Sequence, residues 1–96
     1  FQPHLFTRTR DFAEGFSSSL SLADELIMLD IYPARELPIP GVTSEMILNE
    51  VNLEKKEIST KKDLVNKIKD WSPEVVVTIG AGDIDQMVLP IKKALS

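Results

Sequence analysis

The chain contains no cysteine and only one histidine among its 96 residues. Without cysteine it can form neither a disulfide nor a thiolate metal site, and one histidine cannot build a metal site alone. No apolar run approaches the roughly 20 residues that a membrane-spanning helix requires. The sequence therefore assigns no metal ligand, and no membrane is expected as a partner.

Basic side chains are also in the minority, with 11 Lys and Arg against 15 Asp and Glu, so the formal net charge is −4. Broad nucleic-acid binding requires a basic surface, so nucleic acid is not expected as a partner, although a local cationic pocket remains compatible. The length suits one small domain or part of a larger one. Because the chain starts without Met, on what reads as the end of a strand, we expect its N-terminal part to be missing.

Strand-like and helix-like segments alternate along the sequence. Strands are expected at residues 1–3, 25–32, 57–59 and 74–80; the last of these, EVVVTIG, is the clearest, because it is rich in valine and ends at glycine. Helices are expected at residues 10–22, 44–51, 60–71 and 84–95, with Thr9, Thr60 and Asp83 as caps and a kink or a break at Pro90. The alternation predicts an α/β fold, with a mostly parallel sheet and helices on both faces.

Ligands of such folds bind at the carboxyl ends of the strands, and three stretches occupy that position: QPHLFTRTR, DIYPARELPIPG and GAGD. In GAGD, a GxG turn suits a phosphate at a helix N-terminus, but Asp85 stands where the dinucleotide fingerprint requires glycine or alanine. We therefore favour a structural interpretation, in which Gly80 and Gly82 permit a tight turn and Asp83 caps the next helix.

The proline-rich stretch DIYPARELPIPG begins with Asp30, at the end of a strand that is expected to be buried. A carboxylate is costly to bury without a partner, and long loops in small domains are uncommon unless they bind something. Tyr32, Arg35 and Glu36 follow at once. A purely structural role, in which Asp30 accepts from loop amides and Arg35 and Glu36 are solvated, stays equally open.

The opening stretch places His4, Arg8 and Arg10 in a strand-to-helix loop and the first helical turn. Cations there oppose the helix dipole, so a bound carboxylate or phosphate would resolve the conflict. Arginine is suited to hold either anion through two parallel hydrogen bonds. The alternative is that the arginines pair with nearby acids such as Asp11 and Glu14; we favour anion binding.

Taken together, FQPH, TRTRDF, DIYPARELPIPG and GAGDI resemble the C-terminal domain of the Mur ligases over nearly the whole chain. The resemblance is strongest to the members that join L-alanine to the lactyl carboxylate of UDP-N-acetylmuramate in bacterial peptidoglycan synthesis. It implies a Rossmann-like domain, here lacking its first strand and helix, that closes over the nucleotide of a cytoplasmic enzyme. It also implies that ATP and Mg²⁺ are bound mainly by a missing central domain, and that an acyl phosphate forms and is attacked by the amine of alanine.

The resemblance assigns roles only where the motifs match. It implies substrate binding by His4, Arg8, Arg10 and Asp83, and a cleft lined by Asp30, Tyr32, Gly80 and Gly82. No catalytic group is assigned within the chain, so residues 1–96 alone are expected to be inactive. Leu5 departs from the pattern, since many members carry Arg there. A sibling Mur ligase that adds a peptide, or a non-catalytic α/β binding module, remains an alternative.

Overall fold

Two short parallel strands, β1 (Leu26–Met28) and β2 (Lys56–Ile58), form the assigned sheet of the structure, a computed structural model that describes residues 1–96. The first residues of the chain run alongside β1 and extend this sheet. The N–H of Leu29 donates to the carbonyl of Phe1 at 2.9 Å, and the N–H of Tyr32 donates to the carbonyl of Pro3 at 2.8 Å. The strand end that the sequence predicts at residues 1–3 is therefore observed as parallel pairing, and it extends to residue 5.

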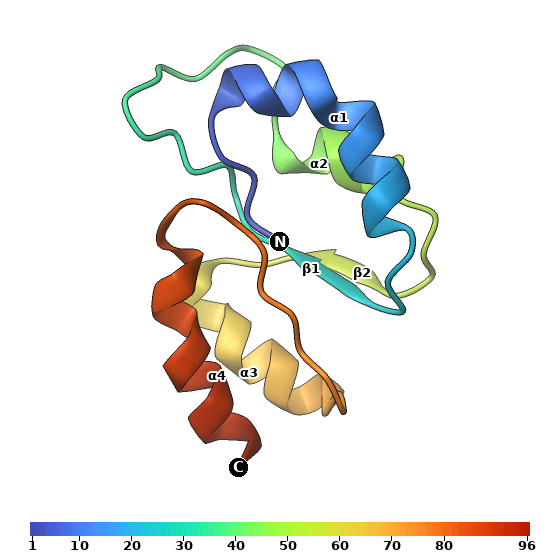
Figure 1. Cartoon of the computed structure of the whole chain (residues 1–96), viewed down its shortest axis with the longest axis vertical. Helices are drawn as coiled ribbons and strands as arrows, with labels where there is room; N and C mark the ends of the chain where they lie inside the picture. The colour runs from blue at the N-terminus through green and yellow to red at the C-terminus, as the bar shows by residue number, and fades with distance from the viewer.

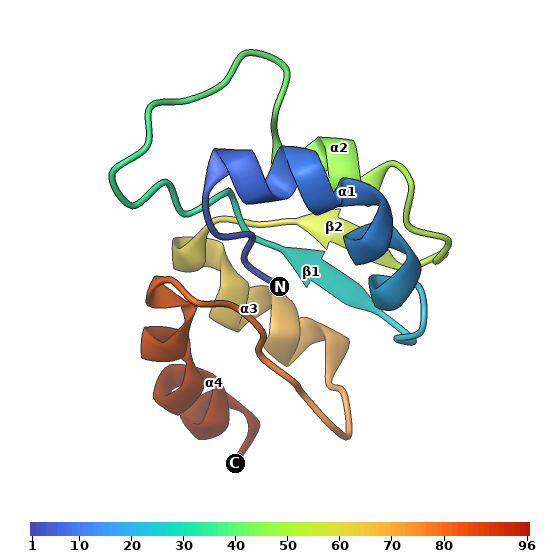
Figure 2. The same ribbon diagram turned by 45° about the horizontal axis from the view of Figure 1, so that its top comes forward.

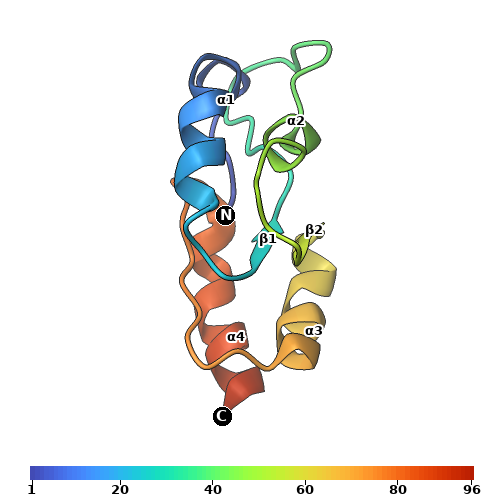
Figure 3. The same ribbon diagram turned by 90° about the vertical axis from the view of Figure 1, so that its right-hand side faces the viewer.

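Helices cover both faces of this small sheet, which confirms the predicted α/β architecture (Figures 1 and 3). One face carries the first two helices and the other carries the remaining ones, including a short 3-10 helix, η1. Their bounds are α1 (Phe6–Leu20), α2 (Ser44–Leu48), α3 (Lys61–Trp71), η1 (Asp83–Met87) and α4 (Val88–Leu95). None of these helices has the length and apolar character needed to cross a membrane.

Alternation along β1 divides the hydrophobic core into two parts. Leu26 and Met28 pack with Ile47 and Val51 beneath α1 and α2, whereas Leu29 packs against α3 and α4. Successive side chains of a strand point to opposite faces of the sheet, so a run that is apolar at every position serves both cores. This is why the segment ELIMLDIY shows no polar alternation.

α3 follows the sequence pattern closely. The Thr60 hydroxyl accepts a hydrogen bond from the N–H of Asp63 at 3.2 Å, and the helix ends at Trp71 with Ser72 in the left-handed region at φ 49°. Leu64 and Ile68 are buried. Trp71 is only half-buried, and the Lys55 ammonium lies 4.4 Å from its ring centroid.

The start of α1 differs from the prediction. The helix begins at Phe6 rather than at residue 10, and Thr9 is not its cap: this side chain is fully buried, and its hydroxyl donates to the carbonyl of Leu5 at 2.8 Å. Leu5, at φ 69°, turns the chain directly from the sheet into the helix. The four-residue spacing of Phe12, Phe16 and Leu20 predicts one apolar stripe on this helix, but only Phe16 and Leu20 pack against the core. Phe12 is 61% exposed and lies at a kink, with φ −116°.

The predicted strands at residues 25–32 and 74–80 are also corrected. The first is regular only over β1, and residues 74–80 form no assigned strand. A strand requires a backbone neighbour along its length, and here only the N–H of Gln2 reaches the segment, donating to the carbonyl of Ile79 at 3.0 Å. Val75, Val77 and Ile79 consequently remain 79%, 72% and 51% exposed.

The last helical stretch is divided, as expected, but at Val88, where η1 passes into α4. Pro90 lies in the first turn of α4, where a missing N–H costs no intrahelical hydrogen bond. The prediction that Asp83 caps this stretch is wrong. Gly82 occupies the N-cap position of η1 and provides no side-chain hydrogen bond.

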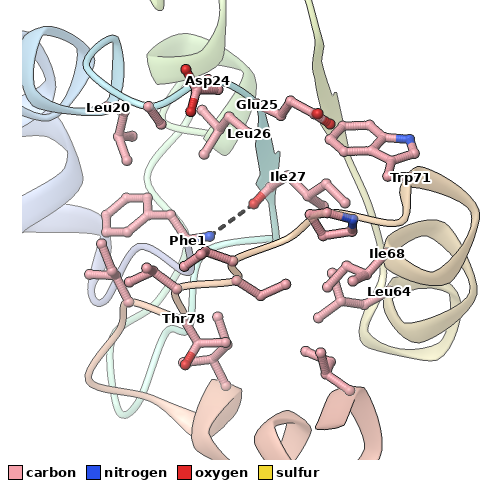
Figure 4. A pocket seen from close by; sticks show the side chains of 18 of the residues that line it. Phe1, Leu20, Asp24, Glu25, Leu26, Ile27, Leu64, Ile68, Trp71 and Thr78 are labelled. Atoms are coloured by element: carbon pink, nitrogen blue, oxygen red, sulfur yellow. Dashed lines mark hydrogen bonds between the residues drawn. The ribbon is translucent and has the colours of Figure 1, made fainter. Parts of the chain in front are cut away.

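An apolar hollow of about 580 Å³ lies between residues 73–79 and the start of β1 (Figure 4). Phe1, Ile27, Leu64 and Ile68 are among the residues that line it. The backbone nitrogen of Phe1 donates to the carbonyl of Ile27 at 2.8 Å.

Candidate functional site

The three stretches singled out in the sequence meet at one edge of the molecule. The loop before α1, the loop after β1 and the turn before η1 lie on the same side of the sheet, at the carboxyl ends of its strands (Figures 1 and 2). A second hollow, of about 380 Å³, opens at this edge, and it is lined largely by polar residues. Gln2, residues 29–33, residues 59–61 and Asp83 line it. Three of the predicted site residues line this polar pocket, namely Asp30, Tyr32 and Asp83. The other predicted site residues do not line it: His4, Arg8, Arg10, Gly80 and Gly82.

His4 and Tyr32 join the first two stretches. They form a parallel β-bridge, and their rings are stacked with centroids 5.7 Å apart at an interplanar angle of 14°. The Nδ1 atom of His4 is buried and has no hydrogen-bond partner. Buried polar atoms without a partner are rare in folded proteins.

Gln2 joins the first stretch to the third, a role that the sequence analysis missed. Its side-chain amide donates to Asp83 Oδ1 at 2.7 Å, and its carbonyl oxygen accepts from the N–H of Ile84 at 3.1 Å. The side chain is buried, with 4% of its surface exposed. The only signal in the sequence was a polar residue within a predicted strand end.

Asp83 is held by two partners, since Lys61 at the start of α3 also forms an ion pair with its Oδ2. The hydrogen bond from Gln2, followed by that from Lys61, keeps the pKa of Asp83 below its usual range. The carboxylate thereby connects the GAGD turn to α3. Its role toward a substrate stays a prediction.

The two glycines of the turn are explained by close packing. A Cβ atom added to Gly82 would lie 2.6 Å from Tyr32 Cγ and 2.7 Å from Gln2 Oε1, and one added to Gly80 would lie 2.8 Å from Ile84 Cγ2. Any side chain at Gly82 would therefore displace Tyr32 and Gln2 from their observed positions. This supports the interpretation of the glycines as requirements of a tight turn.

Asp30 lies in the wall of the polar pocket and is exposed. It forms neither a hydrogen bond with the loop amides nor an ion pair, so the structural role considered for it is not observed. An exposed carboxylate beside Tyr32, Lys61 and Asp83 gives the pocket a mixed electrostatic character, with two acids and one ammonium group.

The two arginines of α1 differ in their surroundings. Arg10 Nε lies 2.9 Å from Asp11 Oδ1, and this hydrogen bond raises the pKa of the guanidinium group. For Arg10 the ion-pair alternative is therefore the one observed. Arg8 is exposed and forms no ion pair. Arg8 is thus the cation of this segment that is available to an external anion.

Glu36 is a second residue whose role the sequence analysis missed. Its Oε1 accepts from the backbone N–H of Thr7 at 3.1 Å, and its Oε2 accepts from the Thr7 hydroxyl at 2.6 Å. These bonds keep the pKa of Glu36 below its usual range. The alternative in which Glu36 is solvated is not observed, since the residue connects the proline-rich loop to the first turn of α1.

Comparison with known proteins gives a consistent picture. No protein-family model matches the chain. The chain is 54% identical over 96 residues to the UDP-N-acetylmuramate–L-alanine ligase of Flavobacterium johnsoniae, and 55% identical over 95 residues to that of Parabacteroides distasonis. The alignments cover 100% and 99% of the chain. The chain is homologous to a segment of these ligases.

The resemblance to the Mur ligases is thereby confirmed. A further UDP-N-acetylmuramate–L-alanine ligase, from Christiangramia forsetii, is 56% identical over 95 residues. The chain spans only about 21% of the length of each of these three relatives. Most of the length of a UDP-N-acetylmuramate–L-alanine ligase therefore has no counterpart in residues 1–96.

The residues of the chain do not form a metal site. No group of three or more His, Asp or Glu side chains lies close enough to hold a metal ion. The acids of the polar pocket are Asp30 and Asp83, and Asp83 is already engaged by Gln2 and Lys61. The structure therefore assigns no Mg²⁺ to side chains of this segment.

Proposed function

We propose that the chain is the larger part of the C-terminal domain of a UDP-N-acetylmuramate–L-alanine ligase. The full protein would use ATP and Mg²⁺, held mainly by other domains, to join L-alanine to UDP-N-acetylmuramate in the bacterial cytoplasm. Identity of 51–56% to ligases of this name, over 92–96 residues, supports the assignment. Residues 1–96 alone would be inactive.

The observation that carries this proposal is the meeting of the three motif stretches at one edge. His4 stacks on Tyr32, Tyr32 contacts the position of Gly82, and Gln2 holds Asp83. Asp30 lines the polar pocket, Arg8 lies in the first turn of α1, and both are exposed without an ion pair in the chain. A set of polar groups, some held in place and others free, is what a substrate-binding edge requires.

In the proposed reaction, the free guanidinium of Arg8 binds an anion, either the carboxylate of alanine or the acyl phosphate. The ring of His4, held by stacking on Tyr32, would lie beside it. Holding the amine of alanine against the acyl carbonyl carbon lets the C–N bond form while phosphate leaves. Closure of this edge over the other domains would exclude water, which otherwise hydrolyses the acyl phosphate.

The apolar hollow supports the proposal that the domain continues before Phe1. A strand leading into Phe1 would enter the gap between residues 73–79 and β1, where the backbone of residues 74–78 lacks a neighbour. A preceding helix would cover the exposed side chains of Val75, Val77 and Ile79. These are the strand and helix that the resemblance implies to be missing.

The proposed activity is tested with the full-length protein that contains this chain. With UDP-N-acetylmuramate, ATP and Mg²⁺ present, phosphate release should depend on L-alanine. Release that instead depends on a tripeptide would identify the sibling ligase. If neither L-alanine nor a tripeptide stimulates phosphate release, the result would favour a non-catalytic binding module and would refute the proposal.

The role of Arg8 is tested by Arg8→Ala in the same protein. Loss of a charged group that binds the reacting anion should reduce kcat/KM for L-alanine by about 100-fold, with an unchanged melting temperature because the side chain is exposed. Lys69→Ala is the matched control, since it removes one exposed cation from the far end of α3. Equal kinetics in the two variants would contradict the assigned role.

A further inference from the structure

Helix α1 begins without a cap from its own sequence. Leu5 occupies the N-cap position at φ 69° and provides no side-chain hydrogen bond, and the first turn contains no acidic residue. The hydroxyl of Thr9 does not serve as a cap, because it donates back to the carbonyl of Leu5. The first N–H groups of a helix need acceptors from outside the helical ladder, so the cap of α1 must come from elsewhere.

That acceptor is Glu36, which lies 29 residues further along the chain. One carboxylate oxygen accepts from the Thr7 N–H at 3.1 Å and the other from the Thr7 hydroxyl at 2.6 Å. A carboxylate at a helix N-terminus also interacts favourably with the helix dipole. Glu36 thus provides both the hydrogen bonds and the charge that the local sequence lacks.

The same bonds determine where the proline-rich loop lies. From Pro33 to Gly41, Glu36 makes the only side-chain hydrogen bonds, and Leu37 is 85% exposed. Within the loop, a turn is closed by the N–H of Glu36 donating to the carbonyl of Pro33 at 2.9 Å. Figure 2 shows the loop between β1 and α2 extending well away from the sheet. Polar attachment of the loop to the body of the molecule therefore depends on one side chain.

Arg8 follows Thr7 directly, so the position of its backbone is set by the capped turn. Both oxygens of Glu36 are engaged by Thr7, and neither forms an ion pair with Arg8. The carboxylate thereby orients the first turn without occupying the neighbouring guanidinium group. Arg10, two residues after Arg8, forms an ion pair with Asp11.

We propose that Glu36 is a positioning residue for the amino-acid site: its two bonds to Thr7 hold the proline-rich loop against α1 and keep Arg8 placed for its anion. The inference rests on the proposed ligase function. It adds to that function a specificity role for an acid that itself contacts no substrate.

The experiment uses the full-length ligase and measures KM separately for each substrate. Glu36→Ala should raise KM for L-alanine by about 10-fold, the loss expected for charge-assisted hydrogen bonds, and leave KM for ATP and UDP-N-acetylmuramate within about twofold. Glu36→Gln keeps one acceptor oxygen and should give a smaller rise. Glu45→Ala is the matched control, because Glu45 is an exposed acid in the first turn of α2 with no side-chain bond to another segment.

Thr7 provides a second route that does not depend on the folding of the Glu36 variants. Thr7→Val removes the hydroxyl and should raise KM for L-alanine about threefold, whereas Thr7→Ser should restore it. The double variant with Glu36→Ala should be no worse than Glu36→Ala alone, since both changes remove the same contact.

Two results would overturn the inference and spare the ligase assignment. One is an active wild-type enzyme in which the Glu36 variants behave like Glu45→Ala. The other is an equal change in all three KM values, which a general loss of structure would produce. A wild-type protein without alanine-dependent phosphate release would instead refute the proposed function itself.

Discussion

The polar pocket and the apolar hollow differ in the side chains that line them. The polar pocket at the carboxyl edge is closed by bonds between distant parts of the chain, such as that from Gln2 to Asp83. The apolar hollow is bordered by Val75 and Val77, which are largely exposed, and by backbone that has no neighbour. In the polar pocket, Gln2, Lys61 and Asp83 bond to one another; in the apolar hollow, the side chains of Val75 and Val77 remain uncovered.

This difference shows which part of the molecule is self-sufficient. Hydrogen bonds are directional, so the arrangement of Gln2, Asp83 and Ile84 can be complete within 96 residues. Apolar burial instead needs surface on both sides, and residues 74–80 have the core on only one. The contacts of the polar pocket are therefore satisfied within residues 1–96, whereas alternate side chains of residues 75–79 remain largely uncovered.

The largest expected effect is that the loss of stability caused by Val77→Asp differs between residues 1–96 and the full-length protein. Val77→Asp should change the unfolding free energy of residues 1–96 by less than about 0.5 kcal/mol, because the side chain is 72% exposed. In the full-length protein it should cost about 3 kcal/mol or more, since preceding residues would bury the charge. Urea unfolding of both proteins measures this.

Val76→Asp is the control for that comparison. Val76 packs against the core on the other side of the segment, so its substitution should destabilise both proteins. Equal effects of Val77→Asp in the short and long proteins would show that the apolar hollow is not where the missing segment packs.

A smaller effect is expected at the polar pocket. Gly82→Ala places a methyl group 2.6 Å from Tyr32 Cγ and should cost about 1–3 kcal/mol, as overpacking of a filled site does. Gly15→Ala, in exposed α1 with no atom within 4 Å of the added Cβ, should instead stabilise by about 0.5–1 kcal/mol. Thermal unfolding distinguishes the two, and a neutral Gly82→Ala would mean that the turn tolerates a side chain.

The smallest effect concerns acid stability. The folded-state pKa values of Glu36 and Asp83 lie below the ordinary values, so their stabilising contribution is present above about pH 4 and is lost as the pH falls through the folded pKa values. The combined Glu36→Gln and Asp83→Asn variant should therefore lose less stability between pH 5 and about 2 than the parent. Asp70→Asn serves as the control, and circular dichroism during acid titration is the measurement.

Much of the fold and part of the site could be predicted from local pattern. The apolar run around β1, the Thr60 cap and the stripe of α3 each depend on residues close in sequence, and each is observed. The gathering of His4, Tyr32 and the GAGD turn followed from a rule about parallel sheets rather than from those residues themselves. The sequence pattern therefore predicted that the three stretches meet at the carboxyl edge of the sheet. It did not predict the hydrogen bonds of Gln2 and Glu36 that connect them.

The sequence by itself determined the alternation of elements, the apolar face that each presents and the motifs shared with the ligases, because these depend on spacing and residue type. Only the tertiary structure decided that Glu36 caps α1, that Gln2 holds the turn at Asp83, and that residues 74–80 form no strand. The reason is separation along the chain: the bonded partners lie 29 and 81 residues apart, and a strand exists only where another backbone lies beside it.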